Sequence, residues 1–476
     1  MSRELDGELG IDLIILGAGP AGMAAAVAAR KLGLSVTVID EQPTPGGQIW
    51  RAVDTIAATP HADILGVEYR KGAAAADAFR ASGAVYEAGA QLWQIEPGST
   101  SGFRAFVTRD GKAWTVTARA VLLATGAQER PVPFPGWTLP GVLTVGAAQI
   151  LLKSARQIPA KPVVIAGCGP LPLLYATQLI AAGGQIAGFL DTSPPGRLGR
   201  ALPHLTRALA KASDLWKGLG WMQTLRREGV PVIRHVAAIE ALGNGRVERV
   251  YHRTHGGAEA MIAAETVFVH EGIVPNVHVA MSLGCAMAWK ESQDCYVPVL
   301  DEFGETSLPG AFIAGDGAGI AGATAAGLRG EIAAIGIAAK LGALDAAEAA
   351  AKALPRRRQL ERELALRPLL DAMFRPRAQV FAPADDTIVC RCEEVTAGTI
   401  RAQVKLGRPG PNQVKAFTRA GMGPCQGRQC GYTVTRVLAA AEGRPAAEVG
   451  FYRVRPPLKP VTLGELASLD TQRSLI

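Results

Sequence analysis

The chain has 476 residues, of which 48% are hydrophobic and 19% are charged, so it can bury the cores of roughly two to four domains and is not a disordered chain. Its 55 glycines and few aromatic residues are typical of Gly-rich turns and Ala-rich helices. The net charge of +8 is not gathered into one basic stripe with interleaved aromatic residues, so we expect no nucleic-acid partner.

The sequence also indicates the cellular compartment in which we expect the protein. Residues 1–10 carry charges of both signs and lack the apolar core of a signal peptide. No segment reaches the ~18 uncharged apolar residues that a transmembrane helix needs. The seven cysteines do not have the spacing of a secreted disulfide framework. We therefore expect a cytoplasmic protein without a membrane span, and peripheral association with the inner membrane stays open.

The first motif lies in residues 11–42, where an apolar strand leads into a glycine turn, an Ala-rich helix and a second strand that ends at Asp40 and Glu41. The turn has the spacing Gly17-x-Gly19-x-x-Gly22. These glycines permit the tight turn, the approach of a pyrophosphate and close helix–strand packing, and the helix N-terminus attracts phosphate. Glu41 is placed to accept from a ribose hydroxyl. The motif predicts a dinucleotide site, with a vestigial loop as the alternative.

Three later segments indicate which dinucleotide the first unit binds. Gly46-Gly47-Gln48 follows the first acids, one apolar strand ends in Ala124-Thr125-Gly126, and another ends in Gly315-Asp316 before a Gly-rich helix start. With these motifs in this order, residues 11–335 resemble the two-dinucleotide-fold flavoproteins of the thioredoxin- and glutathione-reductase type. In that family the Gly-Asp pair holds the ribityl chain of FAD.

The resemblance implies FAD as the cofactor of the first unit. It implies contacts to FAD from Gly17, Gly19, Pro20, Ala21, Gly22, Asp40, Glu41, Gln42, Gly46, Gly47, Gln48, Leu92, Ala124, Thr125, Gly126, Gly315, Asp316, Gly322 and Ala323. Arg51 and Arg130 follow flavin motifs and are weaker candidates for meeting an anionic group.

Residues 162–194 repeat the first motif, which indicates an internal duplication. A strand ends at Gly167-x-Gly169-Pro170, and the next strand ends at Asp191. The third glycine is replaced by Pro172, whose ring needs room and which lacks an N–H donor. In the family this unit holds a nicotinamide, and Asp191 favours NAD over NADP. The possible second nucleotide is therefore NAD or another adenine nucleotide such as ATP, unless the unit is only structural. Residues 246–276 predict the hairpin and returning strand that close it.

The redox cysteines of disulfide reductases are missing. Glutathione reductase-like chains carry C-x4-C just after the first acid, and thioredoxin reductase-like chains carry C-x-x-C in the inserted domain. Neither pattern occurs here, and Cys168, Cys285 and Cys295 are interpreted as core or loop residues. The flavin is therefore not expected to reduce a neighbouring disulfide of that kind.

Four cysteines lie late in the chain, as Cys390-x-Cys392 and Cys425-x4-Cys430. Two separated thiol pairs are typical of a metal centre held by two loops, and C-x-C is too tight for the usual zinc knuckle. We expect a [2Fe–2S] cluster, with zinc, a redox disulfide and no centre as the alternatives. Thr396 is a possible helix N-cap, and Cys392 and Cys430 are expected near helix N-termini, which stabilise thiolates.

The late segment resembles the bacterioferritin-associated-ferredoxin (BFD) type of [2Fe–2S] domain. With it, almost the whole chain resembles the larger, α-type flavoprotein subunits of amine-oxidising dehydrogenases: hydrogen cyanide synthase, opine (octopine or nopaline) oxidase and D-hydroxyproline dehydrogenase. The resemblance implies an FAD-bearing β subunit that oxidises the C–N bond, and a flavin at the subunit interface, for which FMN is a candidate. A small ferredoxin-like γ subunit is a further candidate partner.

The expected fold is α/β, with two dinucleotide-binding domains of the glutathione/thioredoxin reductase type and a small helical C-terminal [2Fe–2S] domain. The expected divisions are an FAD domain (1–145 with 295–345), an inserted NAD-binding-like domain (146–294), a helical basic linker (346–384), the cluster domain (385–455) and a tail (456–476). The basic stretch 354–379 is interpreted as a solvated linker or helix face, or as a docking surface. The Pro-rich, extended tail is a second candidate docking surface.

The sequence thus predicts an FAD- and [2Fe–2S]-containing oxidoreductase subunit that acts on the CH–NH or CH–NH2 group of an amino-acid-type amine. A stand-alone NAD(P)H-dependent FAD and iron–sulfur oxidoreductase is the alternative, and Pro172 argues against it. A non-enzymatic electron-transfer or scaffolding subunit is a third interpretation. No catalytic acid or base can be named, because none of the seven histidines has a partner that the sequence identifies.

Overall fold

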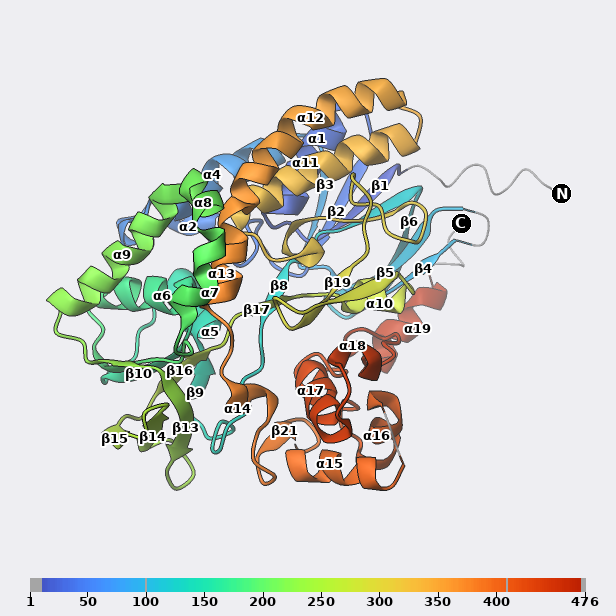
Figure 1. Ribbon diagram of the computed structural model, residues 1–476. Helices are drawn as coiled ribbons and strands as arrows, with labels where there is room; N and C mark the ends of the chain where they lie inside the picture. Colours follow the sequence, from blue (N-terminus) through green and yellow to red (C-terminus); the bar gives the residue numbers. More distant parts are fainter. Residues whose placement is uncertain (1–10, 99–100, 408–409, 472–476) are drawn as a thin grey trace.

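The structure is a computed structural model that describes residues 11–98, 101–407 and 410–471. Its first unit is built on a parallel five-stranded sheet in the order β20-β7-β1-β2-β3 (Figure 1). The strands are β1 (Leu13–Leu16), β2 (Val36–Asp40), β3 (Val85–Ala88), β7 (Ala120–Leu123) and β20 (Ala311–Ile313). β1 and β7 are continuous runs of buried apolar residues, because both faces of the sheet are covered.

Helices cover one face of this sheet and a smaller sheet covers the other. Leu13 and Ile15 pack toward α1 (Pro20–Lys31) and α11 (Ala323–Lys340). Ile14 and Leu16 pack toward the antiparallel strands β4 (Gln91–Pro97), β5 (Phe103–Arg109) and β6 (Lys112–Ala118). The connection from β2 to β3 contains α2 (Val53–Ile56), α3 (His61–Leu65) and α4 (Val67–Arg80).

A second parallel sheet, in the order β12-β11-β10-β16-β9, forms the second unit. Its strands are β9 (Val142–Thr144), β10 (Val163–Gly167), β11 (Ile186–Asp191), β12 (Val232–Arg234) and β16 (Val267–His270). Helices α5 (Val145–Ala155), α6 (Pro170–Ala181) and α9 (Ala212–Arg227) accompany it, with the antiparallel strands β13 (Val236–Leu242), β14 (Arg249–Thr254) and β15 (Glu259–Ala263). The hairpin and returning strand expected in 246–276 are β14, β15 and β16.

A two-stranded ribbon, β8 (Ala127–Glu129) and β17 (Ile273–Pro275), carries the chain into and out of the second unit. Short helices precede α9: α7 (Arg197–Ala201), η1 (Leu202–His204), α8 (Leu205–Ala208) and η2 (Leu209–Lys211). After the ribbon, the chain returns to the first sheet through α10 (His278–Ser282), β18 (Met287–Lys290) and β19 (Cys295–Pro298), and η3 (Gly315–Ala318) follows β20.

The basic stretch 354–379 is helical and is not one solvated face. It lies in α12 (Ala346–Glu363), η4 (Leu364–Leu366), α13 (Arg367–Met373) and α14 (Ala378–Phe381). Arg356, Arg357 and Arg367 form ion pairs with Glu331, Glu302 and Asp371. Arg377 is fully buried in an ion pair with Glu271. Most of this positive charge is therefore neutralised by the chain itself.

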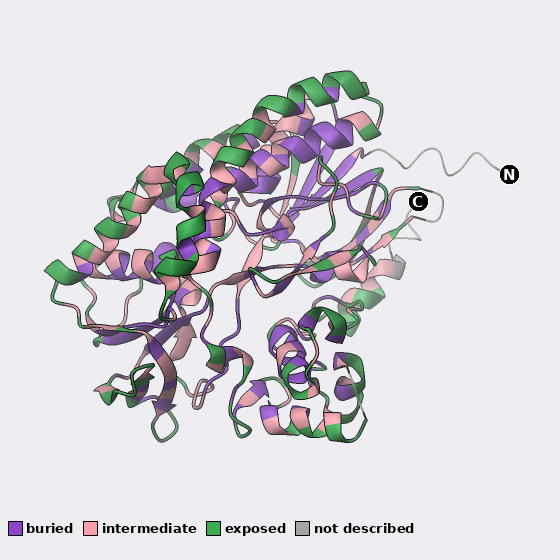
Figure 2. Ribbon diagram, in the orientation of Figure 1, coloured by how far each residue is buried: buried purple, intermediate pink, exposed green. Residues whose placement is uncertain are grey.

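The last part of the chain forms a small helical module with its own core (Figures 1 and 2). Its elements are β21 (Ile388–Cys390), β22 (Val395–Thr396), α15 (Ala397–Lys405), α16 (Pro411–Thr418), α17 (Gly431–Glu442) and α18 (Ala446–Val449). Thr396 caps α15 as predicted, because its hydroxyl accepts from the Thr399 N–H at 3.3 Å.

The C-terminal segment packs on the first unit, so its described residues are not the free extended tail that the sequence suggested. The Leu458 N–H donates to the Trp93 carbonyl at 2.7 Å. α19 (Leu463–Thr471) lies on β6, and the Ala113 N–H donates to Ser468 Oγ at 2.8 Å. The final residues of the tail, 472–476, lie outside the described residues, as do residues 1–10.

Throughout the described part of the chain, each helix is too short or too polar to cross a lipid bilayer.

Candidate cofactor sites and the contact between them

In the first glycine turn, nearby backbone atoms leave no room for a side chain at Gly17 or Gly22. A Cβ on Gly22 would lie 1.9 Å from the Gly17 carbonyl oxygen, and one on Gly17 would lie 2.5 Å from the Ala124 carbonyl oxygen. Gly19 is the N-cap of α1, with Pro20 as the first helical residue. No side chain therefore stands before the first N–H groups of α1, which is the arrangement that a pyrophosphate needs.

The two acids after β2 have different partners. Asp40 is buried and turns back to the glycine turn, where its carboxylate accepts from the Ala18 N–H at 2.5 Å and the Gln42 N–H at 2.7 Å. Burial raises the pKa of Asp40, and these two N–H donors oppose that shift. Glu41 is exposed and forms an ion pair with Lys459 of the C-terminal segment. The expected ribose acceptor is thus engaged by a residue from the far end of the chain.

The other predicted flavin segments converge on this turn. A Cβ on Gly47 would lie 2.9 Å from Gly19 Cα, and one on Gly315 would lie 2.9 Å from Ala21 Cβ. The Gly46 N–H donates to the Ala18 carbonyl at 2.8 Å. A Cβ on Gly317 would lie 3.6 Å from the Gly126 carbonyl oxygen and from Thr125 Oγ1. The four segments therefore meet at the carboxyl ends of β1, β2, β7 and β20, where such sheets bind ligands.

Some predicted contacts serve the loops themselves. The Asp316 carboxylate accepts from the Ala321 N–H at 2.9 Å and the Gly322 N–H at 3.2 Å, so it shapes the turn before Ala323 and α11. Leu92 packs into the apolar cluster under the sheet. Gln48 accepts from Arg51, whose guanidinium lies within this group of loops. Arg130 instead is buried and donates to the carbonyls of Gln293 and Asp294, away from the flavin segments.

Lys153, on α5, is a residue of this site that sequence reasoning missed. Its ammonium is buried and donates to the carbonyls of Gln48 and Ile49 at 3.1 and 3.0 Å, and to Gln149 Oε1 at 3.0 Å. Burial, with a contribution from Arg51, lowers its pKa to about 7. α5 belongs to the second unit, so Lys153 fixes the Gly46–Gln48 loop from outside. In the sequence, the signal for this role is a pair of polar residues four positions apart, Gln149 and Lys153, in an otherwise apolar helix.

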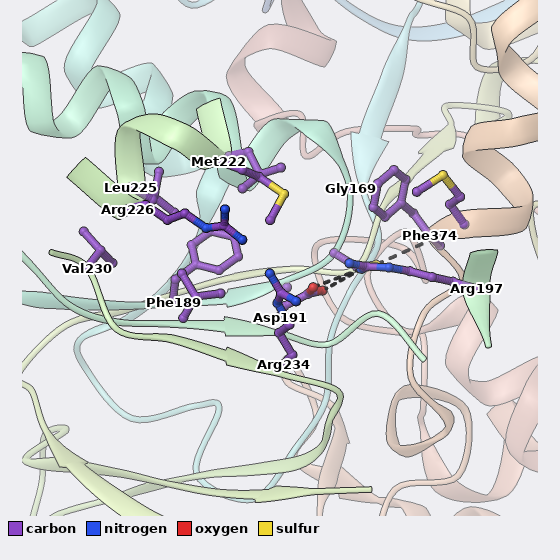
Figure 3. A pocket seen from close by; sticks show the side chains of 15 residues that line it. Gly169, Phe189, Asp191, Arg197, Met222, Leu225, Arg226, Val230, Arg234 and Phe374 are labelled. Carbon is purple, nitrogen blue, oxygen red and sulfur yellow. Dashed lines mark hydrogen bonds and ion pairs between the residues drawn. The ribbon is translucent and has the colours of Figure 1, made fainter. Parts of the chain in front are cut away.

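The second glycine turn opens onto a cavity of about 340 Å³. Gly169 has a positive φ of 99°, which favours glycine. A Cβ built on Gly169 would have no atom within 4 Å, so this side of the turn is open. Pro170 begins α6, and Pro172 is buried in its first turn. Asp191 is held by Arg197 Nη1 at 2.9 Å, and Arg226 and Arg234 line the same cavity (Figure 3). The cavity is thus lined by three guanidinium groups and one carboxylate, and this excess of positive charge favours an anionic ligand.

The linker forms one wall of this cavity. Met373 and Phe374, at the end of α13, line the same cavity as Gly167 and Gly169, and Figure 3 shows Phe374 beside Gly169. Cys168, in the turn, lies 3.6 Å from Glu271 Oε2, and Glu271 pairs with Arg377 of the linker. The residues that follow Phe374 are therefore anchored to the second unit through a fully buried ion pair.

The three cysteines outside the late segment are buried thiols. Burial raises the pKa of Cys285, and it raises the pKa of Cys295 to about 11. Burial and the carboxylate of Glu271 raise the pKa of Cys168 well above its usual range. Thiols in such surroundings are poor nucleophiles, and none of the three is paired in a disulfide.

The late cysteines lie together in the helical module. Cys390 ends β21, Cys392 lies in the turn before β22, and Cys430 is the N-cap of α17. The prediction of a helix N-terminus is thus right for Cys430 and wrong for Cys392. The Gly421 N–H donates to Cys390 Sγ at 3.4 Å, and a Cβ on Gly423 would lie 2.1 Å from Cys392 Cβ.

The four thiols associate in two pairs. A hydrogen bond from Cys430, and then backbone N–H donors, lower the pKa of Cys390 to about 6. Cys392 is hydrogen-bonded to Cys425, and burial raises the pKa of Cys392. Among the described residues, no three Cys, His, Asp or Glu side chains converge on a single ion. Two thiol pairs with backbone N–H donors fit the ligand set of a two-iron cluster, in which two irons share four thiolates.

The helical module packs against the two-stranded ribbon, close to the flavin motif that ends at Gly126. Gln128 Nε2, in β8, donates to the Arg428 carbonyl at 2.9 Å, in the loop between Cys425 and Cys430. The Trp137 indole N–H donates to the Ile388 carbonyl at 2.7 Å. An aromatic cluster of Tyr296, Tyr432 and Phe451 fills the interface. The loop that carries Cys425 and Cys430 therefore contacts Gln128, two residues after Gly126 in the sequence.

The chain matches two known families. Residues 11–339 match the pyridine nucleotide-disulphide oxidoreductase family, and residues 388–440 match the BFD-like [2Fe-2S] binding domain. The chain is 44% identical to the A subunit of opine oxidase from Agrobacterium tumefaciens, over 98% of this chain and 93% of that relative. It is 33% identical to the hydrogen cyanide synthase subunit HcnB of Pseudomonas protegens, over 98% of this chain and 99% of that subunit.

Among solved structures, L-proline dehydrogenase from P. horikoshii matches with a TM-score of 0.70 and 20% identity, over 96% of this chain and 79% of that one. At this identity the likeness concerns the fold.

Proposed function

Because the chain belongs to the pyridine nucleotide-disulphide oxidoreductase family and shares one family of flavoprotein subunits with HcnB and the A subunit of opine oxidase, we propose that it transfers electrons between an amine-oxidising partner and an acceptor. The donor would be an amino-acid-type amine such as an opine, hydroxyproline or glycine. The partner would be an FAD-bearing β subunit that oxidises the C–N bond.

The family and the fold class predicted from the sequence are confirmed, as are the broad class of flavoprotein oxidoreductase and the BFD-like [2Fe–2S] domain. FMN at a subunit interface, a γ subunit, the second nucleotide and the substrate stay predictions.

The observation that carries the proposal is the contact between the cysteine module and the flavin segments. Gln128 lies in β8, two residues after Gly126, and donates to the carbonyl of Arg428, between Cys425 and Cys430. The three other cysteines are buried, unpaired thiols, and Cys295 belongs to the cluster at this interface, so no disulfide competes as the electron outlet. A bound flavin takes two electrons as hydride and a [2Fe–2S] cluster moves them singly, so a chain that holds both converts between the two. This chain's residues set their separation and exclude water.

The test uses the complex purified from its native host, with flavin, iron and sulfide measured. Under anaerobic conditions it is mixed with opines, hydroxyproline, sarcosine, proline or glycine. We expect one of these amines to bleach the flavin of the complex, and NADH to leave the isolated chain unchanged. Rapid bleaching of the isolated chain by NADH, or the absence of any flavoprotein partner, would contradict the proposal.

Cysteine variants separate the two cofactors. Cys425→Ser is expected to remove the iron while amine-dependent bleaching of the flavin persists, and reduction of the acceptor falls at least about tenfold. Cys285→Ser is the matched control, because Cys285 is a buried thiol outside the module, and it should retain iron. Loss of iron from both variants would point to misfolding instead.

A stand-alone NAD(P)H-dependent reductase is a second candidate, favoured by the cavity at the second glycine turn. Arg197 neutralises Asp191 there, so the carboxylate that would repel a 2′-phosphate is already paired, and Arg226 and Arg234 add positive charge. Met373 and Phe374 oppose this function, because these linker side chains take up part of the cavity beside the glycine turn. Titration with NADH and NADPH in parallel distinguishes the two candidates.

A further inference from the structure

The C-terminal segment 452–460 lies against the first unit and is held there at one residue, Leu458. The Leu458 N–H donates to the Trp93 carbonyl at 2.7 Å, and the Arg428 guanidinium donates to the Leu458 carbonyl at 2.7 Å. The Leu458 side chain is buried in the same apolar cluster as Ile39 of β2. Because both backbone groups and the side chain of Leu458 are engaged, the position of the next residue is fixed as well.

That next residue, Lys459, meets the acids that end β2. Its ammonium forms an ion pair with the Glu41 carboxylate, and the Lys459 and Glu41 side chains are 28% and 45% exposed. Asp40, the residue before Glu41, lies close enough to act on the same ammonium: burial lowers the pKa of Lys459, and the Asp40 carboxylate opposes this shift. A cation from the far end of the chain therefore stands beside both acids.

This cation changes the charge balance at the first glycine turn. The turn is shaped for a pyrophosphate, which is itself negative, and Asp40 and Glu41 place two carboxylates at the same edge of the sheet. Like charges repel more strongly where protein partly excludes water. Arg51 acts on Asp40 from the neighbouring loop, and Lys459 pairs with Glu41, so each acid has a cation that offsets its repulsion of the ligand.

The ion pair leaves room for a ribose. A carboxylate has two oxygens with about four lone-pair sites, and an ammonium has three N–H donors. Glu41 can therefore accept from Lys459 and from a ribose hydroxyl at the same time, and Lys459 keeps donors for the oxygens of that ribose. The pair thus completes a ribose site instead of blocking it.

We propose that Lys459 belongs to the first dinucleotide site and holds the ribose of FAD together with Glu41. The inference rests on the flavin of the proposed function, but it depends neither on the amine nor on the partner subunit. The two matched families end at residues 339 and 440, so the segment that supplies Lys459 lies beyond both of them.

Release of FAD from the full chain, purified alone, tests this assignment. Dialysis against the apoprotein of another FAD-binding flavoenzyme traps the released FAD, and absorbance follows its loss. We expect Lys459→Met to release FAD about fivefold faster, as for the loss of a partly exposed ion pair. Lys459→Glu adds a third carboxylate and should release FAD at least about tenfold faster, whereas Lys459→Arg keeps the charge and should stay within about twofold of the parent.

Lys340→Met is the matched control. Lys340 forms a comparable ion pair with Glu305 at 3.0 Å, at the last residue of α11 and roughly 25 Å from the start of that helix near the flavin segments. This variant should release FAD at the rate of the parent. Thermal unfolding of Lys340→Met and Lys459→Met should be similar, because both lysines are partly exposed.

A double-variant cycle shows whether Lys459 acts with Glu41. Glu41→Gln alone should speed the release of FAD. In the Glu41→Gln background, Lys459→Met should have a smaller effect than in the parent, because the charge that Lys459 offsets is gone. Fully additive effects would overturn the joint role of the two residues.

Two further results would overturn the proposal. Unchanged release from Lys459→Met would make the ion pair a surface contact only. Slower release would show that Lys459 competes with the ribose for Glu41. Both results leave the proposed function standing, whereas a full chain that carries no FAD would overturn the proposed function and this inference together.

Discussion

The two glycine turns follow the same order of strand, turn, helix and strand, yet their surroundings differ. In the first, Gly17 and Gly22 have no room for a Cβ, and Asp40 is bonded to the turn. In the second, a Cβ on Gly167 would also meet backbone, 2.2 Å from the His270 carbonyl oxygen, but Pro172 replaces the third glycine and Asp191 is bonded to Arg197. The first glycine is therefore closed by backbone in both turns, and the turns differ at the third position and in the partners of the acid.

This difference shows that two turns with similar motif spacing can be suited to different ligands. The first turn keeps the glycines and the open helix N-terminus that a pyrophosphate needs, while its ribose acceptor, Glu41, is paired with Lys459. The second retains the strand order but has gained three arginines and a wall from the linker, so it suits a short anionic ligand. The following predictions test how far the two turns have diverged.

The largest effect is expected at the third glycine position. Gly22→Ala would push α1 away from β1, and we expect a loss of about 3 kcal/mol or more in the free energy of unfolding, together with loss of flavin. Pro172→Ala, at the same position of the second turn, should change stability by less than about 1 kcal/mol and leave flavin bound. Denaturant unfolding and flavin content measure both. Equal behaviour of the two variants would show that the turns are equivalent.

Lys153 joins the two units, and its charge makes their contact sensitive to pH. The folded pKa is about 7 against 10.5 for an ordinary lysine, so between these values the unfolded chain binds more protons and stability rises with pH. Relative to Lys153→Met, the parent should gain about 1.4 kcal/mol per pH unit across this window. Unfolding of both proteins from pH 6 to 10 measures the difference. A difference that stays constant with pH would contradict this assignment.

A smaller effect is expected from the acids that end the second strands. Asp40→Asn leaves one of two N–H donors facing an amide NH2, so we expect a loss of about 1–3 kcal/mol in stability and roughly tenfold weaker retention of flavin. Asp191→Asn disrupts its pair with Arg197 and should leave flavin retention unchanged. Dialysis against the apoprotein of an FAD-binding flavoenzyme as a flavin trap compares the variants with the parent. Flavin loss from Asp191→Asn would argue that the second unit supports the first site directly.

The smallest effect is expected in the second cavity. Arg234→Gln removes one of three cations there, and binding of 2′,5′-ADP should weaken about fivefold or less, as for a partly solvated ion pair. Arg246→Gln, an exposed arginine outside the cavity, is the control. Isothermal titration provides the measurement. Unchanged affinity in Arg234→Gln would remove this arginine from the site.

The local motifs could be read from the sequence because each lies within a few dozen residues. The turns at Gly17 and Gly167, the cap at Thr396 and the grouping of the late cysteines depend on such short-range patterns. The pairing of Glu41 with Lys459, the grip of Lys153 on the Gly46–Gln48 loop and the wall formed by Phe374 join residues that are far apart in the chain. Periodicity and spacing carry no information on such contacts, because they depend on how whole units pack.

The order of strands in the first sheet has a consequence for synthesis. β20 lies beside β7, but it follows the entire second sheet in the chain, and α11 then packs on α1. On the ribosome, the second unit is fully made before the first can close, so the nascent first unit waits with the β7 edge and the α11-facing side of α1 uncovered. A chain that stalls before β20 would expose these surfaces to chaperones and proteases, while its second sheet would already have all five strands.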